Sequence, residues 1–352
     1  MRVAVVFGGR STENYVSRLS AKSVINNIDT DKYEIVTIGI TTEGKWFHYI
    51  GNTNQMSEEN WHEYAEVNTE GKIVSGFERL EREDIDVIIP VLHGPNGEDG
   101  TVQGFFELLG KPYVGCGVLS SAISLDKAYT KIVCEKEGLQ QCAYRVFSRQ
   151  DIEENADRCA EIVERELSYP CFIKPSNAGS SVGISKASNH EELIKAFNIA
   201  AEYDYRVVAE AFVDGREIEC AVLGNVDPQV AIPGEVIAAN DFYDYSAKYF
   251  NEQSRTEVPA NISEEQINEV KELAKRAYKC LDCRGLARVD FFLERKTGRF
   301  IFNEINTLPG FTNISMYSMM WNKSGIVYSD LIDRLIELAF ENYGERKRKY
   351  TI

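Results

Sequence analysis

The order of apolar and polar positions predicts an α/β protein that opens with a parallel sheet. Continuous apolar runs over residues 3–7, 33–40 and 86–92 are typical of strands buried on both faces. The first run leads into a glycine turn and a helix-like stretch over 16–27, which is the usual opening of a doubly wound domain. Residues 101–109 are predicted to be helical, and residues 112–115 are expected to close this sheet.

Two polar side chains follow the ends of these strands. Glu13 comes after the first apolar run and His93 directly after the third. Ligands of open α/β sheets bind at the carboxyl ends of the strands, so both residues are candidate site residues. A histidine that braces its loop is the alternative for His93. The polar segment over 42–76 looks like an insertion, and we assign it no function.

From about residue 120 the pattern changes to strands and helices in less regular order. Ser188 and Glu191 stand at capping-box spacing, and Ser263 stands at an N-cap position. Strands are predicted over 206–213 and 214–223, and a loop over 311–317. Helices are predicted over 188–203, 263–281 and 328–341, and a further helix is expected to start in the stretch 124–131.

One stretch near the C-terminus, residues 288–310, reads as a β-hairpin with Gly298 in its turn. A symmetric turn places Asp290 opposite Glu304, and it places Arg288 opposite Asn306. Side chains two apart on a strand share a face, so the four converge. Carboxylate and amide oxygens suit Mg²⁺, which makes this patch a candidate metal site. A solvated hairpin face is the alternative.

Composition narrows the classes of partner. With 352 residues the chain is long enough for two or three domains, and its formal net charge of −16 argues against nucleic acid or an anionic membrane. The apolar start reads as a buried strand rather than a signal peptide. Eight cysteines are too sparse for a disulfide scaffold, and Cys280-Leu-Asp-Cys283 is taken as structural, with a metal pair as the alternative. We therefore expect a reducing cytoplasm.

Two further stretches carry candidate chemistry. A strand leads to Lys174 and then to a loop rich in glycine and serine over 179–183, whose backbone N–H groups could close over phosphates. The spacing is not that of a P-loop. Residues 238–250 form a polar, aromatic stretch that reads as a lid, or alternatively as a surface loop packed on the body.

Seven blocks together resemble the D-alanine–D-alanine ligases of the ATP-grasp superfamily. They are Phe7-Gly-Gly-Arg-Ser-Thr-Glu13, the segment from His93 to Gly104, Asp126-Lys127, the segment from Phe172 to Gly183, the segment from Asp241 to Tyr249, Arg288-Val-Asp290 and the segment from Asn303 to Thr312. The resemblance implies an N-terminal doubly wound parallel-sheet domain over 1–115. It also implies two α+β ATP-grasp domains, over 116–210 and 211–352, that sandwich ATP.

The resemblance also implies which residues hold the nucleotide and its metal. Its ATP-binding set would be Lys127, Lys174, Ser180, Ser181, Glu210, Ala211, Phe212, Glu217 and Phe292. Glu210 and Ala211 would meet the adenine edge, the two phenylalanines its faces, and Glu217 the ribose. Two Mg²⁺ ions, for which Mn²⁺ can substitute, would be held by Asp290, Glu304 and Asn306.

For the amino-acid substrates the resemblance implies ligation of two D-alanines through an acyl phosphate, for peptidoglycan precursor synthesis. Glu13 would fix the first ammonium, with His93 nearby, while Arg288 and the Gly310 N–H stabilise the oxyanion. Ser180 and Tyr249 would tie the lid to Glu13. The implied substrate set is Glu13, His93, Lys248, Tyr249, Arg288, Gly310, Ser315 and Met316.

Two positions depart from the family pattern, namely Tyr15, where an acidic residue is usual, and Ser318, where proline is common. Met316 is apolar, whereas relatives that use D-serine tend to carry arginine there, so D-alanine is favoured. The rival hypotheses are a D-alanine–D-serine ligase of the vancomycin-resistance type and a catalytically silent nucleotide-binding regulator. Expected partners are ATP, D-alanine and a second copy of the chain in a homodimer.

Overall fold

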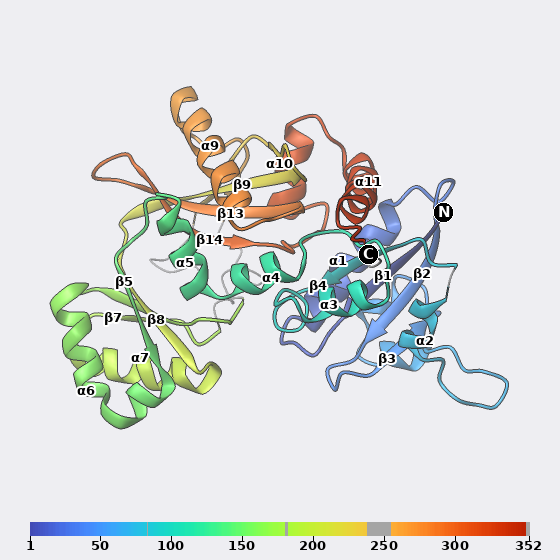
Figure 1. Cartoon of the computed structure of the whole chain (residues 1–352), viewed down its shortest axis with the longest axis horizontal. Coiled ribbons are helices and arrows are strands. Elements are labelled where there is room, and N and C mark those ends of the chain that lie inside the picture. The colour runs from blue at the N-terminus through green and yellow to red at the C-terminus, as the bar shows by residue number, and fades with distance from the viewer. Residues whose placement is uncertain (83, 180–181, 238–254, 350–352) are drawn as a thin grey trace.

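Three sheets with flanking helices build the chain (Figure 1). The computed structural model describes residues 1–82, 84–179, 182–237 and 255–349. No helix in these ranges is long and apolar enough to cross a membrane.

The first sheet has the strand order β3-β2-β1-β4. Its three apolar strands, β1 (Arg2–Gly8), β2 (Glu34–Ile40) and β4 (Val87–Leu92), run parallel, as their continuous apolar pattern predicts. The edge strand β3 (Trp46–Tyr49) is antiparallel to β2. The accompanying helices are α1 (Asn14–Asn27), α2 (Gly76–Glu81) and α3 (Thr101–Leu108). Residues 112–115 do not form the expected closing strand, because only an isolated bridge joins Tyr113 to Ile88.

The segment over 42–76 is part of this first unit rather than an appendage. It supplies β3 and two 3-10 turns, η1 (Gln55–Ser57) and η2 (Trp61–Tyr64). Its side chains of Phe47, Tyr49, Met56 and Trp61 are buried in the same core as Phe7 of β1. The rings of Phe7 and Trp61 have centroids 5.5 Å apart. The segment therefore closes one end of the first core.

The second sheet, of order β5-β8-β6-β7, is antiparallel. Its strands are β5 (Tyr144–Ser148), β6 (Cys171–Pro175), β7 (Ser185–Ala187) and β8 (Arg206–Ala211), and its helices are α6 (Arg149–Glu166) and α7 (His190–Tyr203). The predicted cap of α7 is wrong by one residue. Asn189 is the N-cap and accepts from the Glu192 N–H, while Glu192 accepts from Ser188 N–H. Asn189 thus takes the role that was assigned to Ser188.

The third sheet has the order β12-β11-β9-β13-β14, with β10 paired to β9. Its strands are β9 (Gly215–Gly224), β10 (Gln229–Val230), β11 (Gly234–Ile237), β12 (Arg255–Glu257), β13 (Gly285–Glu294) and β14 (Phe300–Asn306). Helix α9 (Glu264–Cys280) lies between β12 and β13 in the chain, and helices α10 (Met316–Lys323) and α11 (Tyr328–Glu345) follow β14. The Ser263 N-cap of α9 is confirmed, whereas the predicted loop over 311–317 ends early because α10 begins at Met316.

The hairpin register predicted for β13 and β14 is confirmed at the residues that matter. Arg288 pairs with Asn306 and Asp290 pairs with Glu304. A β-bulge between Asp290 and Phe291 then shifts the pairing by one residue toward the turn. The hairpin is therefore not symmetric about Thr297, the midpoint of both polar pairs, but the bulge leaves these pairs in place.

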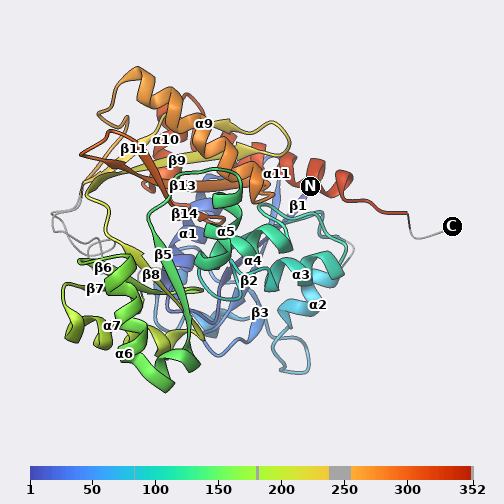
Figure 2. The same cartoon turned by 60° about the vertical axis from the view of Figure 1, so that its left-hand side comes forward.

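Helices α4 (Val118–Leu125) and α5 (Lys127–Lys136) follow the first sheet in the chain and pack against the third. Helix α4 contacts both α3 and β14, and α5 contacts β14. Figures 1 and 2 both place them beside β14, and Cys116, Cys134 and Leu139 belong to the core of the third sheet. The domain boundaries 1–115, 116–210 and 211–352 stay a prediction. Each sheet draws its strands from one of these ranges, apart from Ala211 at the end of β8.

Candidate active site

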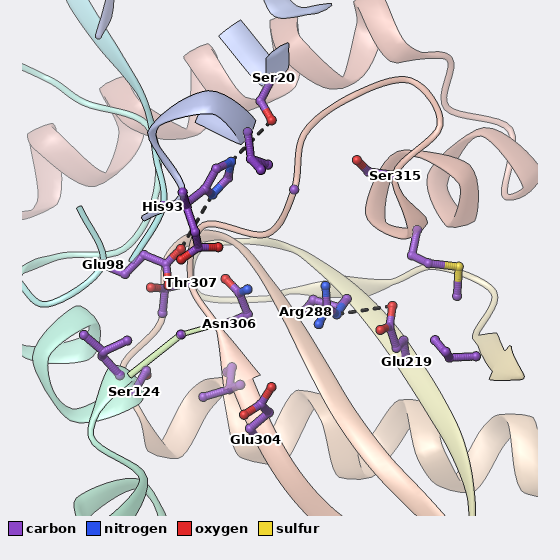
Figure 3. A pocket seen from close by; sticks show the side chains of 18 of the residues that line it. Ser20, His93, Glu98, Ser124, Glu219, Arg288, Glu304, Asn306, Thr307 and Ser315 are labelled. Atoms are coloured by element: carbon purple, nitrogen blue, oxygen red, sulfur yellow. Dashed lines mark hydrogen bonds and ion pairs between the residues drawn. The ribbon is translucent and has the colours of Figure 1, made fainter. Parts of the chain in front are cut away.

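A cavity of about 500 Å³ lies where the first and third sheets meet α4 and α5 (Figure 3). Nine of the predicted site residues line it, namely Glu13, His93, Lys127, Arg288, Glu304, Asn306, Gly310, Ser315 and Met316. These residues come from the start of α1, the end of β4, α5, β13, β14 and the segment that enters α10, so the fold gathers them from about 300 positions of sequence.

The carboxylate of Glu13 is buried in a corner made by two glycines. A Cβ atom at Gly94 would lie 2.8 Å from its Oε2, and one at Gly179 would lie 3.0 Å from the same oxygen. Gly94 also has a positive φ of 74°. A side chain at either position would displace the carboxylate, so both glycines are needed for the position of Glu13.

His93 sits at the carboxyl end of β4 in a hydrogen-bonded setting. Its Nδ1 lies 3.0 Å from the carbonyl oxygen of Leu308 and 3.6 Å from Oε1 of Glu98, and its Nε2 lies 3.3 Å from Oγ of Ser20 (Figure 3). Burial opposes a charged imidazole, yet the carboxylates of Glu98 and then Glu13 raise the pKa of His93 above its ordinary value. Burial also opposes a charged carboxylate at Glu98, and this raises the pKa of Glu98 above its ordinary value. The pair can share one proton beside the cavity.

The predicted metal ligands lie on adjacent strands of the third sheet. Asp290 is directly opposite Glu304, and Asn306 shares their face two residues along β14. Arg288 holds Asp290 with two bonds, Nε to Oδ1 at 2.8 Å and Nη2 to Oδ2 at 2.7 Å. Glu304 lies 3.6 Å from the Lys127 ammonium. This set of hard oxygen donors fits Mg²⁺, although Arg288 now holds both oxygens of Asp290.

Lys127 is the first residue of α5, where Asp126 caps the helix. The Asp126 carboxylate accepts from the N–H groups of Ala128 and Tyr129 and pairs with Arg206. The Lys127 ammonium donates to the Ala178 carbonyl at 2.9 Å, beside the glycine-serine loop. The helix N-terminus and this ammonium both favour an anion at the same end of the cavity.

A buried ion triad lies behind the cavity. The Glu210 carboxylate is 2.7 Å from the Lys174 ammonium and 3.2 Å from that of Lys131. Burial opposes its charge, yet the two lysines lower the pKa of Glu210 to about 2. Glu210 raises the pKa of both lysines against the cost of their burial. The carboxylate of Glu210 is therefore engaged by the two lysines. Any contact of Glu210 with adenine would come from its main chain.

The other described candidates lie outside the cavity lining. Ala211 and Phe212 follow each other at the end of β8, where the Phe212 ring lies 6.1 Å from that of Phe172. Glu217 of β9 is opposite Phe292 of β13. Ser180, Ser181, Lys248 and Tyr249 fall outside the described residues, so their predicted roles stay predictions.

The loop before α10 closes the far end of the cavity. Ser315 is the residue before the helix, and its Oγ lies 2.7 Å from Oγ1 of Thr312 and accepts from the Thr312 N–H. A Cβ at Gly310 would lie 3.3 Å from Oγ of Ser315. Met316 begins the helix, and its Cε atom lies close to Gly234. A helix N-terminus with a hydroxyl suits a carboxylate.

Comparisons with known proteins agree with this geometry. Residues 2–116 match the family model described as D-ala D-ala ligase N-terminus, and residues 133–337 match that described as D-ala D-ala ligase C-terminus. The chain belongs to the D-alanine–D-alanine ligase family. The predicted family and its ATP-grasp fold are thereby confirmed.

Individual relatives extend over nearly the whole ligase chain. The D-alanine–D-alanine ligase of Ruminiclostridium cellulolyticum is 53% identical and covers 99% of this chain and 98% of its own. Among solved structures, the VanG D-Ala:D-Ser ligase of Enterococcus faecalis has a TM-score of 0.83 at 38% identity and covers 96% of this chain and 99% of its own. The D-alanine–D-alanine ligase of Coxiella burnetii has a TM-score of 0.83 at 34% identity and covers 98% and 95%.

Three residues of this ligase-family site were missed by the sequence analysis. Glu98 stands in a loop whose motif was noted, and its contact with His93 was not predicted. Lys131 follows Lys127 by one helical turn, which is a usable signal, but its burial was not foreseen. Glu219 follows Glu217 by two positions and so shares its face of β9, where its carboxylate lies 3.2 Å from Arg288.

Proposed function

We propose that the chain ligates two D-alanines to D-alanyl-D-alanine, coupled to the cleavage of ATP to ADP and phosphate, for peptidoglycan precursor synthesis. The observation that carries this proposal is that Glu13, Lys127, Arg288 and Glu304 all line one cavity. Family membership supplies the class of reaction, since the relatives that match over nearly the full chain are named D-alanine–D-alanine ligases.

In the first step, a carboxylate oxygen of the first D-alanine attacks the γ-phosphorus of ATP, and the bond to ADP breaks. Lys127 and Lys174 would neutralise phosphate charge as the acyl phosphate forms, because phosphoryl transfer depends mostly on positioning and charge. Asp290, Glu304 and Asn306 would hold Mg²⁺, which when bound neutralises the phosphates. Glu13 would receive the ammonium of the first D-alanine.

In the second step, the amine of the second D-alanine attacks the acyl carbon. The tetrahedral intermediate carries an oxyanion, for which Arg288 and the Gly310 N–H are the proposed donors. The carbon–oxygen bond to phosphate then breaks, phosphate leaves, and the attacking nitrogen loses a proton. Ser315 and the α10 N-terminus would hold the carboxylate of the second substrate.

A D-alanine–D-serine ligase is the second candidate, because the structure of VanG, a D-Ala:D-Ser ligase, is similar along most of the chain. Met316 lines the cavity with an apolar side chain. Its thioether sulfur is only a weak acceptor for the hydroxyl group of a D-serine substrate. This favours D-alanine at the second subsite.

The test is phosphate release from ATP and Mg²⁺ with D-alanine alone and with D-alanine plus D-serine, with products identified by mass. D-alanyl-D-alanine as the main product in both mixtures supports the proposal. A switch to D-alanyl-D-serine in the mixture would replace it by the second candidate. Nucleotide binding without phosphate release under either condition would favour the silent regulator.

We also infer a homodimer that works in the reducing cytoplasm. The dimer is inferred from the family alone, and sedimentation equilibrium tests it. The eight free cysteines support a reducing compartment.

A further inference from the structure

Three carboxylates lie in one row across the third sheet. Glu219 of β9 is paired with Asp290 of β13, which in turn is paired with Glu304 of β14. Residues directly opposite on neighbouring strands point to the same face, so the row presents three acids side by side. Glu219 and Glu304 line the cavity. Such a row needs cations beside it, since like charges opposite each other destabilise a sheet.

Arg288 lies beside this row, two residues from Asp290 on the same face of β13. Its Nε and Nη2 hold the two oxygens of Asp290 at 2.8 and 2.7 Å. Its Nε also lies 3.2 Å from Oε2 of Glu219, as Figure 3 shows. The Glu219 side chain is only 6% exposed. Arg288 thus has two carboxylate partners, one on its own strand and one on the strand beside it.

The proposed function places a metal ion on the same Asp290 carboxylate that Arg288 now contacts, so the two cations compete for it. Mg²⁺ demands oxygen ligands at about 2.0–2.1 Å in near-octahedral geometry, so a metal bound to Asp290 must take an oxygen that Arg288 now holds. Arg288 must nevertheless stay in the cavity for the oxyanion. A buried guanidinium without a carboxylate would be costly. Glu219 can keep its contact with Nε whatever Asp290 does, because it belongs to another strand.

We propose that Glu219 is a positioning residue that holds the guanidinium of Arg288 in the cavity while Asp290 binds the metal. This inference rests on the proposed function. Glu219 engages the Nε edge of the guanidinium, so the Nη group that now bonds Asp290 becomes available to the oxyanion. Glu219 acts through Arg288 and does not itself touch the reacting atoms.

A role of Glu219 as a metal ligand is the competing explanation. Oxygens of Glu217, Glu219 and Asp290 lie within 4.8 Å of one another, which is close enough for a shared cation. A cation among them would, however, stand beside the positive Arg288, whose Nε is already within 3.2 Å of Glu219. The geometry therefore favours the arginine as the partner of Glu219.

The experiment compares Glu219→Gln in the wild type and in an Arg288→Lys background, with the Glu235→Gln variant as control. Glu235 belongs to the same sheet, is equally buried and accepts from Arg216 at 2.7 Å, but it lies outside the cavity lining. We expect Glu219→Gln to lower kcat about 10- to 100-fold, because loss of this ion pair lets the guanidinium shift away from the oxyanion, with the KM for ATP within threefold. In the Arg288→Lys background it should lower kcat less than threefold, and Glu235→Gln should leave kcat within twofold.

A readout without turnover separates the two explanations. Mn²⁺ affinity, measured by electron paramagnetic resonance with a non-hydrolysable ATP analogue, should fall less than tenfold in Glu219→Gln. A larger loss in both backgrounds would make Glu219 a metal ligand and overturn the proposal. An unchanged kcat, or a full effect of Glu219→Gln without Arg288, would also overturn it. Phosphate release by the wild type tests the proposed function separately.

Should Glu219→Gln not fold, the wild type still decides the matter. In its structure with Mg²⁺ and the ATP analogue, a Glu219 oxygen within 3.2 Å of the Arg288 Nε supports the proposal. A Glu219 oxygen on the metal refutes it.

Discussion

The buried triad of Lys131, Glu210 and Lys174 yields a quantitative prediction for Glu210→Gln. The change keeps the shape of the side chain and removes the one carboxylate that contacts both ammonium groups at 3.2 and 2.7 Å. It leaves two buried lysines facing an amide. We expect a large local loss of stability in the second sheet, where β6 carries Lys174 and β8 carries Glu210.

The pKa of Glu210 sets the size of this loss. A folded-state pKa of about 2, against 4.5 for the free side chain, corresponds to about 3 kcal/mol of stability at neutral pH. Removing one partner of a buried charge cluster costs about 3–5 kcal/mol in other proteins, which agrees. Because the folded pKa is lowered, this stability is present above pH 4.5 and is lost as the pH falls toward 2.

Hydrogen exchange followed by mass spectrometry is the suitable assay, because it resolves β6 and β8 from the other sheets. At pH 7 a loss of about 3 kcal/mol raises the opening equilibrium of these strands about 100-fold. Under the proposed function, ATP should narrow the gap between variant and wild type, since phosphates meet the Lys174 charge. Thermal unfolding at pH 3 and 7 should show a smaller difference at the lower pH.

The control is Glu191→Gln, which removes an exposed carboxylate paired with Lys195 on α7 and should leave exchange unchanged. An acceleration below fivefold in β6 and β8 of Glu210→Gln would refute the reasoning. It would mean that the two lysines find water or another partner when the carboxylate is gone.

Three further changes have defined outcomes. Glu98→Gln should lower the pKa of His93 in an NMR titration, because Glu98 raises it. The stability that His93 adds below about pH 6.5, which is lost as the pH rises through its folded pKa, should shrink too. An unmoved titration would contradict the contact. Arg18→Met should raise the KM for D-alanine severalfold and leave the KM for ATP unchanged. The reason is that the Arg18 guanidinium lies 5.1 Å from the ring of Tyr15, which lines the cavity. Equal effects on the two KM values would contradict this. Asp290→Asn should raise the Mg²⁺ concentration for half-maximal activity at least tenfold, and an unchanged requirement would remove Asp290 from the ligand set.

The hairpin shows what local sequence information could predict. Alternation along two strands and a glycine turn were enough to pair Arg288 with Asn306 and Asp290 with Glu304. The bulge after Asp290, which lies in the pairing of β13 with β14, was not predictable. Alternation along a strand does not indicate where an extra residue interrupts the pairing.

Contacts between distant segments account for the rest of what was missed. Arg288 and Glu219 are 69 positions apart, and Lys131 and Glu210 are 79 apart, so no spacing rule links either pair. Trp61 lies in a segment whose polar composition suggested an insertion, yet its ring packs on Phe7. In each case burial is decided by the tertiary fold, which composition alone does not reveal.

The packing of the segment over 42–76 places a fluorescent side chain, Trp61, near the end of the cavity that is proposed to bind the amino-acid substrates (the amino-acid end). The guanidinium of Arg18 lies 5.2 Å from the ring of Trp61 and also contacts Tyr15, which lines the cavity. Tryptophan emission responds to nearby charge, so movement of this wall on substrate binding should change the intrinsic fluorescence. The chain has no tryptophan between residues 62 and 320, so the second sheet contributes no tryptophan emission. A titration by fluorescence would therefore follow occupation of the amino-acid end and leave the nucleotide end unseen.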